Sequence, residues 1–237
     1  MARSGGAKGS AKGSGMRPFR AALLAVVVVG IGALAYAVLA GGGAATEPIE
    51  LEGVDSPQAL MQRADGVPLG AEDAPVTVIE FGDFQCPACG TFARQVKPFL
   101  EAEYIETGQV RFIFYDFPLI SAHENAFLAA RAARCSADQD RYWEYHDHLF
   151  GAQARWSSAR NPVGEFVDYA EELGLDADEF ERCVESDRHA DVVSASRELA
   201  LQLGVRSTPT VMVNGRQLVA GTDYDALKEM IEEDLGG

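Results

Sequence analysis

The chain has few cysteines and few histidines, and their spacing does not fit a structural metal site. There are four residues of each kind among 237. Only Cys86 and Cys89 lie close together, whereas Cys135 and Cys183 stand alone. A zinc site usually takes its four cysteine or histidine ligands as two closely spaced pairs. The pattern therefore favours a redox pair without a metal, and Gly90 after Cys89 excludes haem attachment, which needs a histidine there.

Basic residues are also scarce, and those present are unevenly placed. Lysine and arginine number 20 against 36 aspartates and glutamates, which gives a formal net charge of −16 at pH 7. Five of the basic residues and no acidic residue lie within residues 1–20, so residues 21–237 carry a more negative net charge than the whole chain. Nucleic-acid binding depends on a basic surface, and this composition argues against it.

Charged residues are absent from residues 21–40, AALLAVVVVGIGALAYAVLA. A helix of this length spans a hydrocarbon core of about 30 Å. The basic flank predicts that residues 1–20 form a disordered cytoplasmic tail and that the body lies outside the cell membrane. The alternative is a cleaved signal peptide, with residues 35–37 as a small-x-small cleavage site and a secreted or periplasmic product. Both interpretations export the body to a compartment where disulfides persist.

The cysteine pair is predicted to lie where a strand meets a helix. Residues 76–84, VTVIEFGDF, are rich in β-branched and aromatic residues, and a helical pattern begins at Pro87. Cys86 then becomes the N-cap, where proline suits the next position. The positive end of the helix dipole favours an anion, so the pKa of Cys86 should fall. Cys89, one turn later, can attack a mixed disulfide formed on Cys86.

Glu80 is an acidic residue in an otherwise apolar strand, six residues before Cys86. One interpretation turns its side chain to solvent. The other buries it, because strand alternation places it on the same face as Val78. A buried carboxyl group has a raised pKa and could relay a proton to a buried thiol such as Cys89.

The rest of the chain divides into a linker, a strand-bearing domain and a helical segment. Residues 41–66 are predicted to be a linker with a short helix. Residues 67–120 and 205–237 carry the strands and a final amphipathic helix. Residues 121–204 have a wholly helical pattern. The aromatic residues and histidines of that segment are interpreted as packing residues and surface histidines: His123, Trp143, Tyr145, His146, His148 and Phe150.

The order of these elements resembles the DsbA-type branch of the thioredoxin superfamily, over roughly residues 67–235. The motifs that carry the resemblance are VIEFGDFQCPAC, CSADQDRYWEYHDHLF and GVRSTPTVMVNG. It implies an α/β protein, with a thioredoxin fold that contains an inserted all-helical domain and is preceded here by a transmembrane helix. It also implies a cis bond between Thr208 and Pro209, in a loop that lies beside the reactive sulfur and binds an extended substrate.

These observations predict a membrane-tethered, extracytoplasmic thiol–disulfide oxidoreductase that donates disulfides to exported proteins and needs no cofactor. The resemblance implies a membrane re-oxidase of the DsbB or vitamin K epoxide reductase type as its partner. The alternatives are a disulfide reductase or isomerase, and a peptide-binding chaperone whose cysteine pair is idle. Ala88 stands where the best-known oxidases of the family carry histidine, and it supplies no positive charge to the thiolate.

Cys135 and Cys183 are predicted to form a structural disulfide between two helices. Free thiols outside the cytoplasm, on a protein with its own oxidising site, would be a liability. The alternative is a pair of buried free cysteines, which are common core residues.

Overall fold

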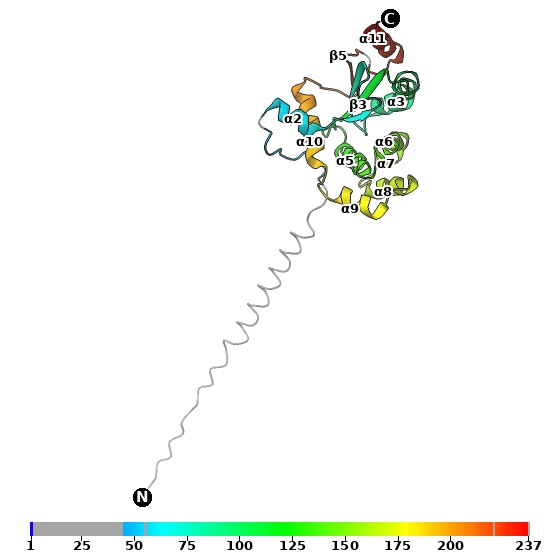
Figure 1. The fold of residues 1–237 in the computed structure, drawn as a ribbon. Coiled ribbons are helices and arrows are strands. Elements are labelled where there is room, and N and C mark those ends of the chain that lie inside the picture. The colour runs from blue at the N-terminus through cyan, green and yellow to red at the C-terminus, as the bar shows by residue number, and fades with distance from the viewer. Residues whose placement is uncertain (2–44, 55, 220, 237) are drawn as a thin grey trace. The chain divides into compact units, whose positions relative to one another are not determined.

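The computed structural model describes residue 1 and residues 45–54, 56–219 and 221–236 (Figure 1). The predicted transmembrane helix at 21–40 lies outside the described residues, as do residues 2–20 of the predicted tail. Within the described part of the chain, no helix is both long enough and apolar enough to cross a membrane.

A five-stranded sheet of order β1-β3-β2-β4-β5 forms the centre of the described fold. The central strand β2 (Val76–Gly82) runs parallel to β3 (Val110–Asp116) and antiparallel to β4 (Thr210–Val213). The edge strands β1 (Val67–Leu69) and β5 (Arg216–Gln217) are antiparallel to their neighbours. A parallel pair needs a crossover connection, and three consecutive helical segments supply it between β2 and β3. These are α3 (Pro87–Gln95), α4 (Lys97–Leu100) and the π-helix η1 (Glu101–Ile105).

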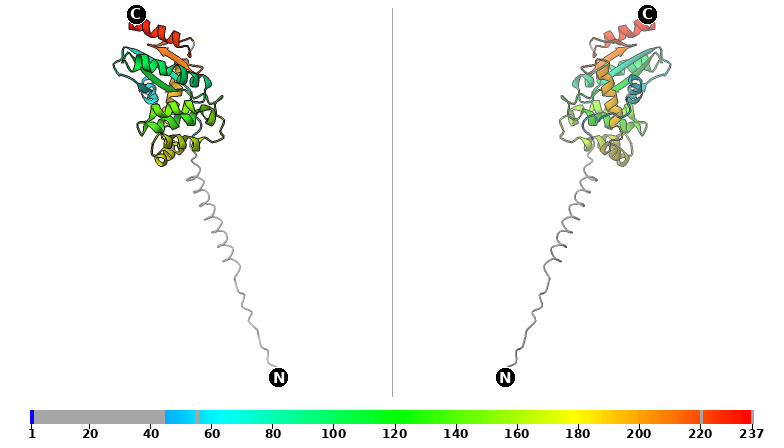
Figure 2. Two further views of the ribbon diagram at one scale, coloured as in Figure 1. Left: turned by 90° about the vertical axis from the view of Figure 1, so that its right-hand side faces the viewer. Right: turned by 90° about the vertical axis from the view of Figure 1, so that its left-hand side faces the viewer.

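Most helices between β3 and β4 pack on one another and on the face of the sheet that carries Val78 and Phe112, whereas the last of them packs on the opposite face, against Phe81. Figures 1 and 2 show α5 to α9 gathered together, away from α11. Gly174 follows α8 with φ +75°, a left-handed conformation that glycine adopts readily at helix ends. These helices, and the final one, are α5 (Ala126–Ala137), α6 (Tyr142–Gly151), α7 (Gln153–Trp156), α8 (Val163–Glu172), α9 (Ala177–Glu185), α10 (Ala190–Gln202) and α11 (Tyr224–Leu235).

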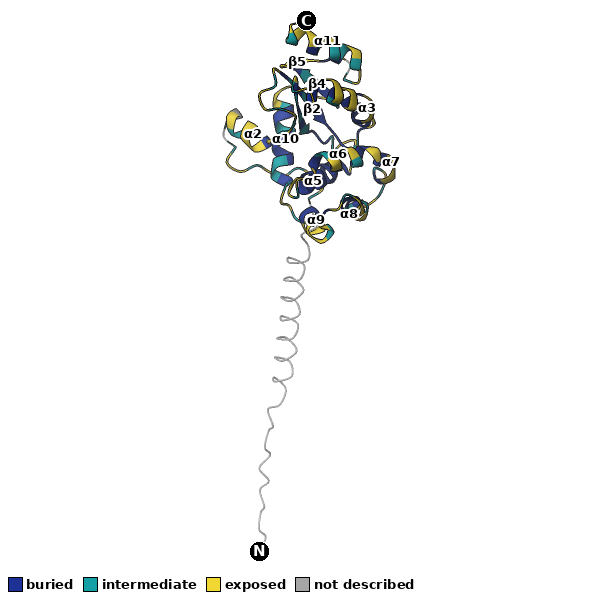
Figure 3. Ribbon diagram, turned by 45° about the vertical axis from the view of Figure 1, so that its right-hand side comes forward, coloured by how far each residue is buried: buried dark blue, intermediate teal, exposed yellow. Residues whose placement is uncertain are grey.

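Helix α2 (Pro57–Ala64) shows how the linker joins this core. Its N-cap Ser56 accepts a hydrogen bond from the N–H of Ala59 at 3.1 Å, as an N-cap serine commonly does. Leu60 and Ala64 are buried in one cluster with residues of α10, while the opposite side of α2 is exposed (Figure 3). The amphipathic pattern of α2 therefore fixes it against α10.

His146 occupies the middle of an aromatic cluster between the sheet and α6. Its ring packs edge-on against Phe84, Phe114 and Phe150, with centroid distances of 5.4, 5.0 and 4.9 Å. The interpretation of His146 as a surface histidine is wrong, because α6 turns this residue toward the sheet and buries it completely. Burial lowers the pKa of His146, and its Nδ1 lies 2.8 Å from Asp147 Oδ1.

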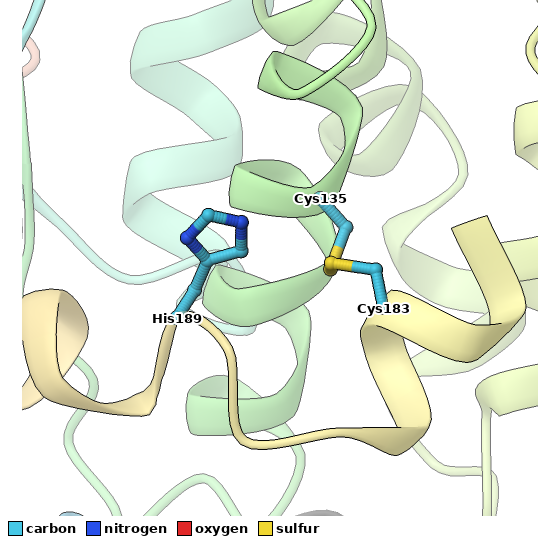
Figure 4. Close-up of side chains that lie close together, drawn as sticks. All are labelled: Cys135, Cys183 and His189. Atoms are coloured by element: carbon cyan, nitrogen blue, oxygen red, sulfur yellow. A yellow bond between two sulfur atoms is a disulfide. The ribbon is translucent and has the colours of Figure 1, made fainter. Parts of the chain in front are cut away.

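A disulfide joins Cys135 of α5 to Cys183 of α9, with Cα atoms 5.8 Å apart. A ring nitrogen of His189 lies within 4.8 Å of both sulfurs (Figure 4). Zinc binds thiolates, and the two sulfurs are bonded to each other instead. This cluster is therefore a covalent link between two helices of the segment.

A buried ion pair fastens α5 to the end of β3. Arg134 donates from Nε to Asp116 Oδ2 at 2.8 Å and from Nη1 to the carbonyl oxygen of Asp65 at 2.7 Å. The side chain of Asp116 is completely buried and that of Arg134 is 6% exposed. Removing one partner of such a pair leaves an uncompensated charge in the interior.

We predict that Arg134→Met lowers the free energy of unfolding by about 3–5 kcal/mol, because Asp116 loses its only charged partner in the described structure. Adding Asp116→Asn should recover part of the loss. Arg141→Met is the control, since Arg141 pairs with Glu144 on the surface and its loss should cost less than about 1 kcal/mol. Equal losses in both variants by urea denaturation would contradict this account.

Candidate active site

Cys86 lies at the point where the chain leaves β2 and enters α3. It is the N-cap of α3, with φ −70° and ψ 123°, and Pro87 occupies the first turn. Its carbonyl oxygen already accepts the N–H of Gly90 at 3.1 Å, while its side chain extends beyond the helix end. The residue is 7% exposed, so a small part of it remains open to solvent.

The surroundings of Cys86 favour its thiolate and lower the pKa of Cys86 to about 5. The hydrogen bond from the Cys89 thiol is the largest cause, and burial acts in the opposite direction. Hydrogen bonding with the side chain of Thr208 and with the N–H groups of Ala88 and Cys89 lowers the pKa further. These N–H groups are the unpaired donors of a helix start, so the local fold itself stabilises the anion.

Cys89 has the opposite character. It is completely buried, and burial is the largest cause that raises its pKa. The hydrogen bond with Cys86 and the charge of Glu80 raise it further. Its sulfur accepts the N–H of Asp83 at 3.4 Å. Both cysteines are free thiols in this structure, so it shows the reduced pair with one sulfur suited to attack and the other protonated.

Glu80 is buried on β2, on the face that carries Val78, and is 1% exposed. Burial raises the pKa of Glu80, while the charge of Lys97 lowers it. Lys97 is itself 2% exposed on its side chain and pairs with Glu101 and Asp147 at 3.1 and 3.0 Å. Of the two orientations that the sequence left open for Glu80, the structure has the buried one.

The loop before β4 lies against the reactive sulfur. The Thr208–Pro209 peptide bond is cis. The Cys86 thiol donates to the carbonyl oxygen of Thr208 at 3.4 Å. A Cβ atom on Gly221 would lie 2.9 Å from the carbonyl oxygen of Pro209, so only glycine permits the close approach of these two loops. Segments 122 residues apart in sequence thus meet at Cys86.

Two glutamines that no sequence motif singled out tie the cysteine turn to the helical segment. Gln153 of α7 donates from Nε2 to the carbonyl oxygens of Phe84 and Cys86 at 2.7 and 2.9 Å. Gln85 donates to the carbonyl oxygen of Ser157 at 2.6 Å. Isolated polar residues carry no periodic signal, and only the folded chain shows which main-chain groups they reach.

Comparison with known proteins agrees with this geometry. The family model described as Thioredoxin matches residues 62–233. The chain belongs to the thioredoxin family. The probable disulfide bond formation protein D of Bacillus anthracis is 34% identical over 169 residues, which cover 70% of this chain and 77% of that protein.

Two solved structures share the fold of this thioredoxin-family chain. Oxidised BdbD from Bacillus subtilis superimposes with a TM-score of 0.66 at 31% identity, covering 72% of this chain and 92% of that one. The α-DsbA1 protein of Wolbachia pipientis gives a TM-score of 0.66 at 23% identity, covering 73% and 92%, and supports the fold alone. The expected DsbA-like fold is confirmed, and the protein is a thiol–disulfide oxidoreductase.

We predict that the reduced protein shows a thiolate titration near pH 5 that Cys86→Ala abolishes. In the unfolded chain the pKa of a cysteine is about 8.5. Because the folded pKa is lower, Cys86 contributes stability that is fully present above pH 8.5 and is lost as the pH falls through about 5. Cys89 stays protonated in both states below about pH 8.5 and does not oppose this trend.

Ultraviolet absorbance of the thiolate measures the titration directly, and denaturation of the reduced protein across this pH range measures the linked stability. The difference in unfolding free energy between the native chain and Cys86→Ala should grow with pH. A difference that is flat between pH 5 and 8 would contradict the lowered pKa.

Proposed function

We propose that the Cys86–Cys89 pair donates disulfides to exported proteins. The observation that carries this proposal is the contrast between the two sulfurs, a thiolate with a pKa of about 5 at Cys86 and a buried thiol at Cys89. A stabilised thiolate favours the reduced form of the enzyme. The oxidised form then gives up its disulfide more readily.

The reaction proceeds in two exchanges. A substrate thiolate attacks the sulfur of Cys86, the bond between Cys86 and Cys89 breaks, and its electron pair passes to the Cys89 sulfur. Cys89 then takes up a proton, for which Glu80 is the candidate source, because burial raises the pKa of its carboxyl group and favours the protonated form. A second substrate thiolate attacks the substrate sulfur of the mixed disulfide and releases Cys86 as a thiolate.

The loop at Thr208 and Pro209 is proposed to hold the substrate during these steps. The carbonyl oxygen of Thr208 lies 3.4 Å from the Cys86 sulfur, so a main-chain acceptor is available beside the reacting atom. An extended peptide that hydrogen-bonds to this loop would bring its cysteine to Cys86, as in strand addition.

The enzyme's place in the cell is also part of the proposal. Residues 21–40 would anchor it in the cell membrane with residues 1–20 in the cytoplasm and the redox domain outside. Each turnover leaves Cys86 and Cys89 reduced, so a membrane re-oxidase of the DsbB or vitamin K epoxide reductase type would restore the disulfide. The pair itself needs no cofactor.

The alternatives differ in the direction of electron flow. A reductase would have to deliver electrons from a thiolate that the protein stabilises, which weakens it as a donor. An isomerase of this family usually carries a dimerisation module, for which residues 47–66 are too short. A chaperone would bind peptides with the cysteines idle. Oxidised protein mixed with a reduced, unfolded substrate separates the three, because only a donor forms substrate disulfides in proportion to the enzyme added.

We predict that Cys89→Ala accumulates mixed disulfides between Cys86 and substrate proteins, because Cys89 is no longer there to attack the mixed disulfide and displace the substrate from Cys86, whereas Cys86→Ala forms none. Non-reducing gels followed by mass spectrometry of the linked peptides make the comparison. The doubly substituted Cys86→Ala, Cys89→Ala chain is the control for disulfides that form elsewhere. Trapping through Cys89 in the Cys86→Ala chain would reverse the assigned roles.

We predict that the full-length protein stays with the membrane fraction after alkaline carbonate extraction, because twenty apolar residues remain inserted. A chain that begins at residue 45 should be released. A mature soluble form whose first residue lies near Val38, identified by mass spectrometry, would show that the segment is a cleaved signal peptide.

A further inference from the structure

A histidine–carboxylate pair lies at the turn between β2 and α3, next to the redox cysteines. Nδ1 of His123, in the loop between β3 and α5, is 2.7 Å from Oδ2 of Asp83, in the turn between β2 and α3. The side chain of Asp83 is completely buried and that of His123 is 20% exposed. The interpretation of His123 as an ordinary surface histidine does not account for this contact.

The main chain of Asp83 touches both cysteines. Its N–H donates to the Cys89 sulfur at 3.4 Å, and its carbonyl oxygen accepts the N–H of Cys86 at 3.0 Å. Its carboxylate also accepts the N–H groups of Gln85 and Leu119 at 2.7 and 2.8 Å. A carboxylate with this many fixed donors has one available orientation, so the ring of His123 is held at a fixed place relative to the pair.

Two negative groups favour the charged form of His123. The hydrogen bond with Asp83 is the largest cause that raises the pKa of His123, burial lowers it, and the charges of Asp83 and Cys86 raise it. These two are the ionisable groups that act on the His123 ring in the described structure. Electrostatic coupling is mutual, so an imidazolium that the thiolate stabilises must stabilise the thiolate in return.

We propose that His123, oriented by Asp83, is the cationic partner of the Cys86 thiolate and takes up a proton when the pair is reduced. It supplies from the β3–α5 loop the positive charge that Ala88 cannot supply from within the CPAC sequence. The proposal rests on the thiol–disulfide activity of the protein and not on the identity of its substrates. His123 acts through its charge and is a positioning residue.

The proton and electron balance is as follows. Two substrate thiols lose two electrons and two protons and become a disulfide, and the Cys86–Cys89 bond accepts both electrons. Cys89 takes one proton and Cys86 remains a thiolate. The second proton binds His123 in those molecules whose imidazole was neutral in the oxidised enzyme, and otherwise passes to solvent.

The experiment compares the native protein with His123→Gln, which can still hydrogen-bond to Asp83 but carries no charge. His148→Gln is the matched control, because His148 is also partly exposed, at 26%, and pairs with a carboxylate, Glu172, at 3.3 Å. In His123→Gln we expect the pKa of Cys86 to rise by about one unit and the equilibrium constant for oxidising glutathione to fall about tenfold. His148→Gln should leave both values unchanged.

A second measurement needs no substitution. The ring of His123 is titrated by NMR in the oxidised and in the reduced protein, and its pKa should be higher in the reduced form, where the Cys86 thiolate is present. Equal values in the two forms would overturn the proposal. So would a His123→Gln protein that is less stable but keeps the native Cys86 pKa and glutathione equilibrium. Because glutathione is the probe, either result stands whether or not exported proteins are the substrates.

Discussion

The negative charge on the Cys86 sulfur is the constraint around which this structure is arranged. A thiolate at low pH has to be stabilised by groups that are already in place, and the start of α3 provides N–H donors in fixed directions. Cys89 can serve as a donor only because it is buried and stays protonated. Opposite surroundings for two residues three positions apart follow from placing one at the helix end and the other against the sheet.

The helical segment contributes to this arrangement although it holds neither cysteine of the pair. Gln153 secures the carbonyl oxygen of Cys86 from α7. Phe84, two residues before Cys86, packs against the rings of His146 and Phe150 from α6. The disulfide between Cys135 and Cys183 links two of the helices in this layer. A segment that the sequence presents as an insertion thus forms one wall of the site.

Local sequence patterns were sufficient for the strand–CPAC–helix junction, because strand composition, helix periodicity and the N-cap position of Cys86 depend on neighbouring residues. The DsbA-like fold was implied by the resemblance of the motifs and of the element order to that family. The role of Asp83 and His123 could not be predicted from local patterns, because it depends on a contact between residues 40 positions apart. The burial of Lys97 and His146 was missed for another reason. A lysine or histidine on an amphipathic helix is usually at the surface, and both are buried here.

Alanine at position 88 would leave the thiolate without a nearby cation if the helix start were its only support. The fold offers a different source, since the β3–α5 loop reaches the turn before the pair and places an imidazole against Asp83. A charge on a separate loop can be changed by substitution without disturbing the start of α3. The residues between the cysteines belong to that helix start, so a substitution there would alter the charge and the helix together. In this chain the tuning of the thiolate and the geometry of the helix start are therefore assigned to different segments, joined through the main chain of Asp83.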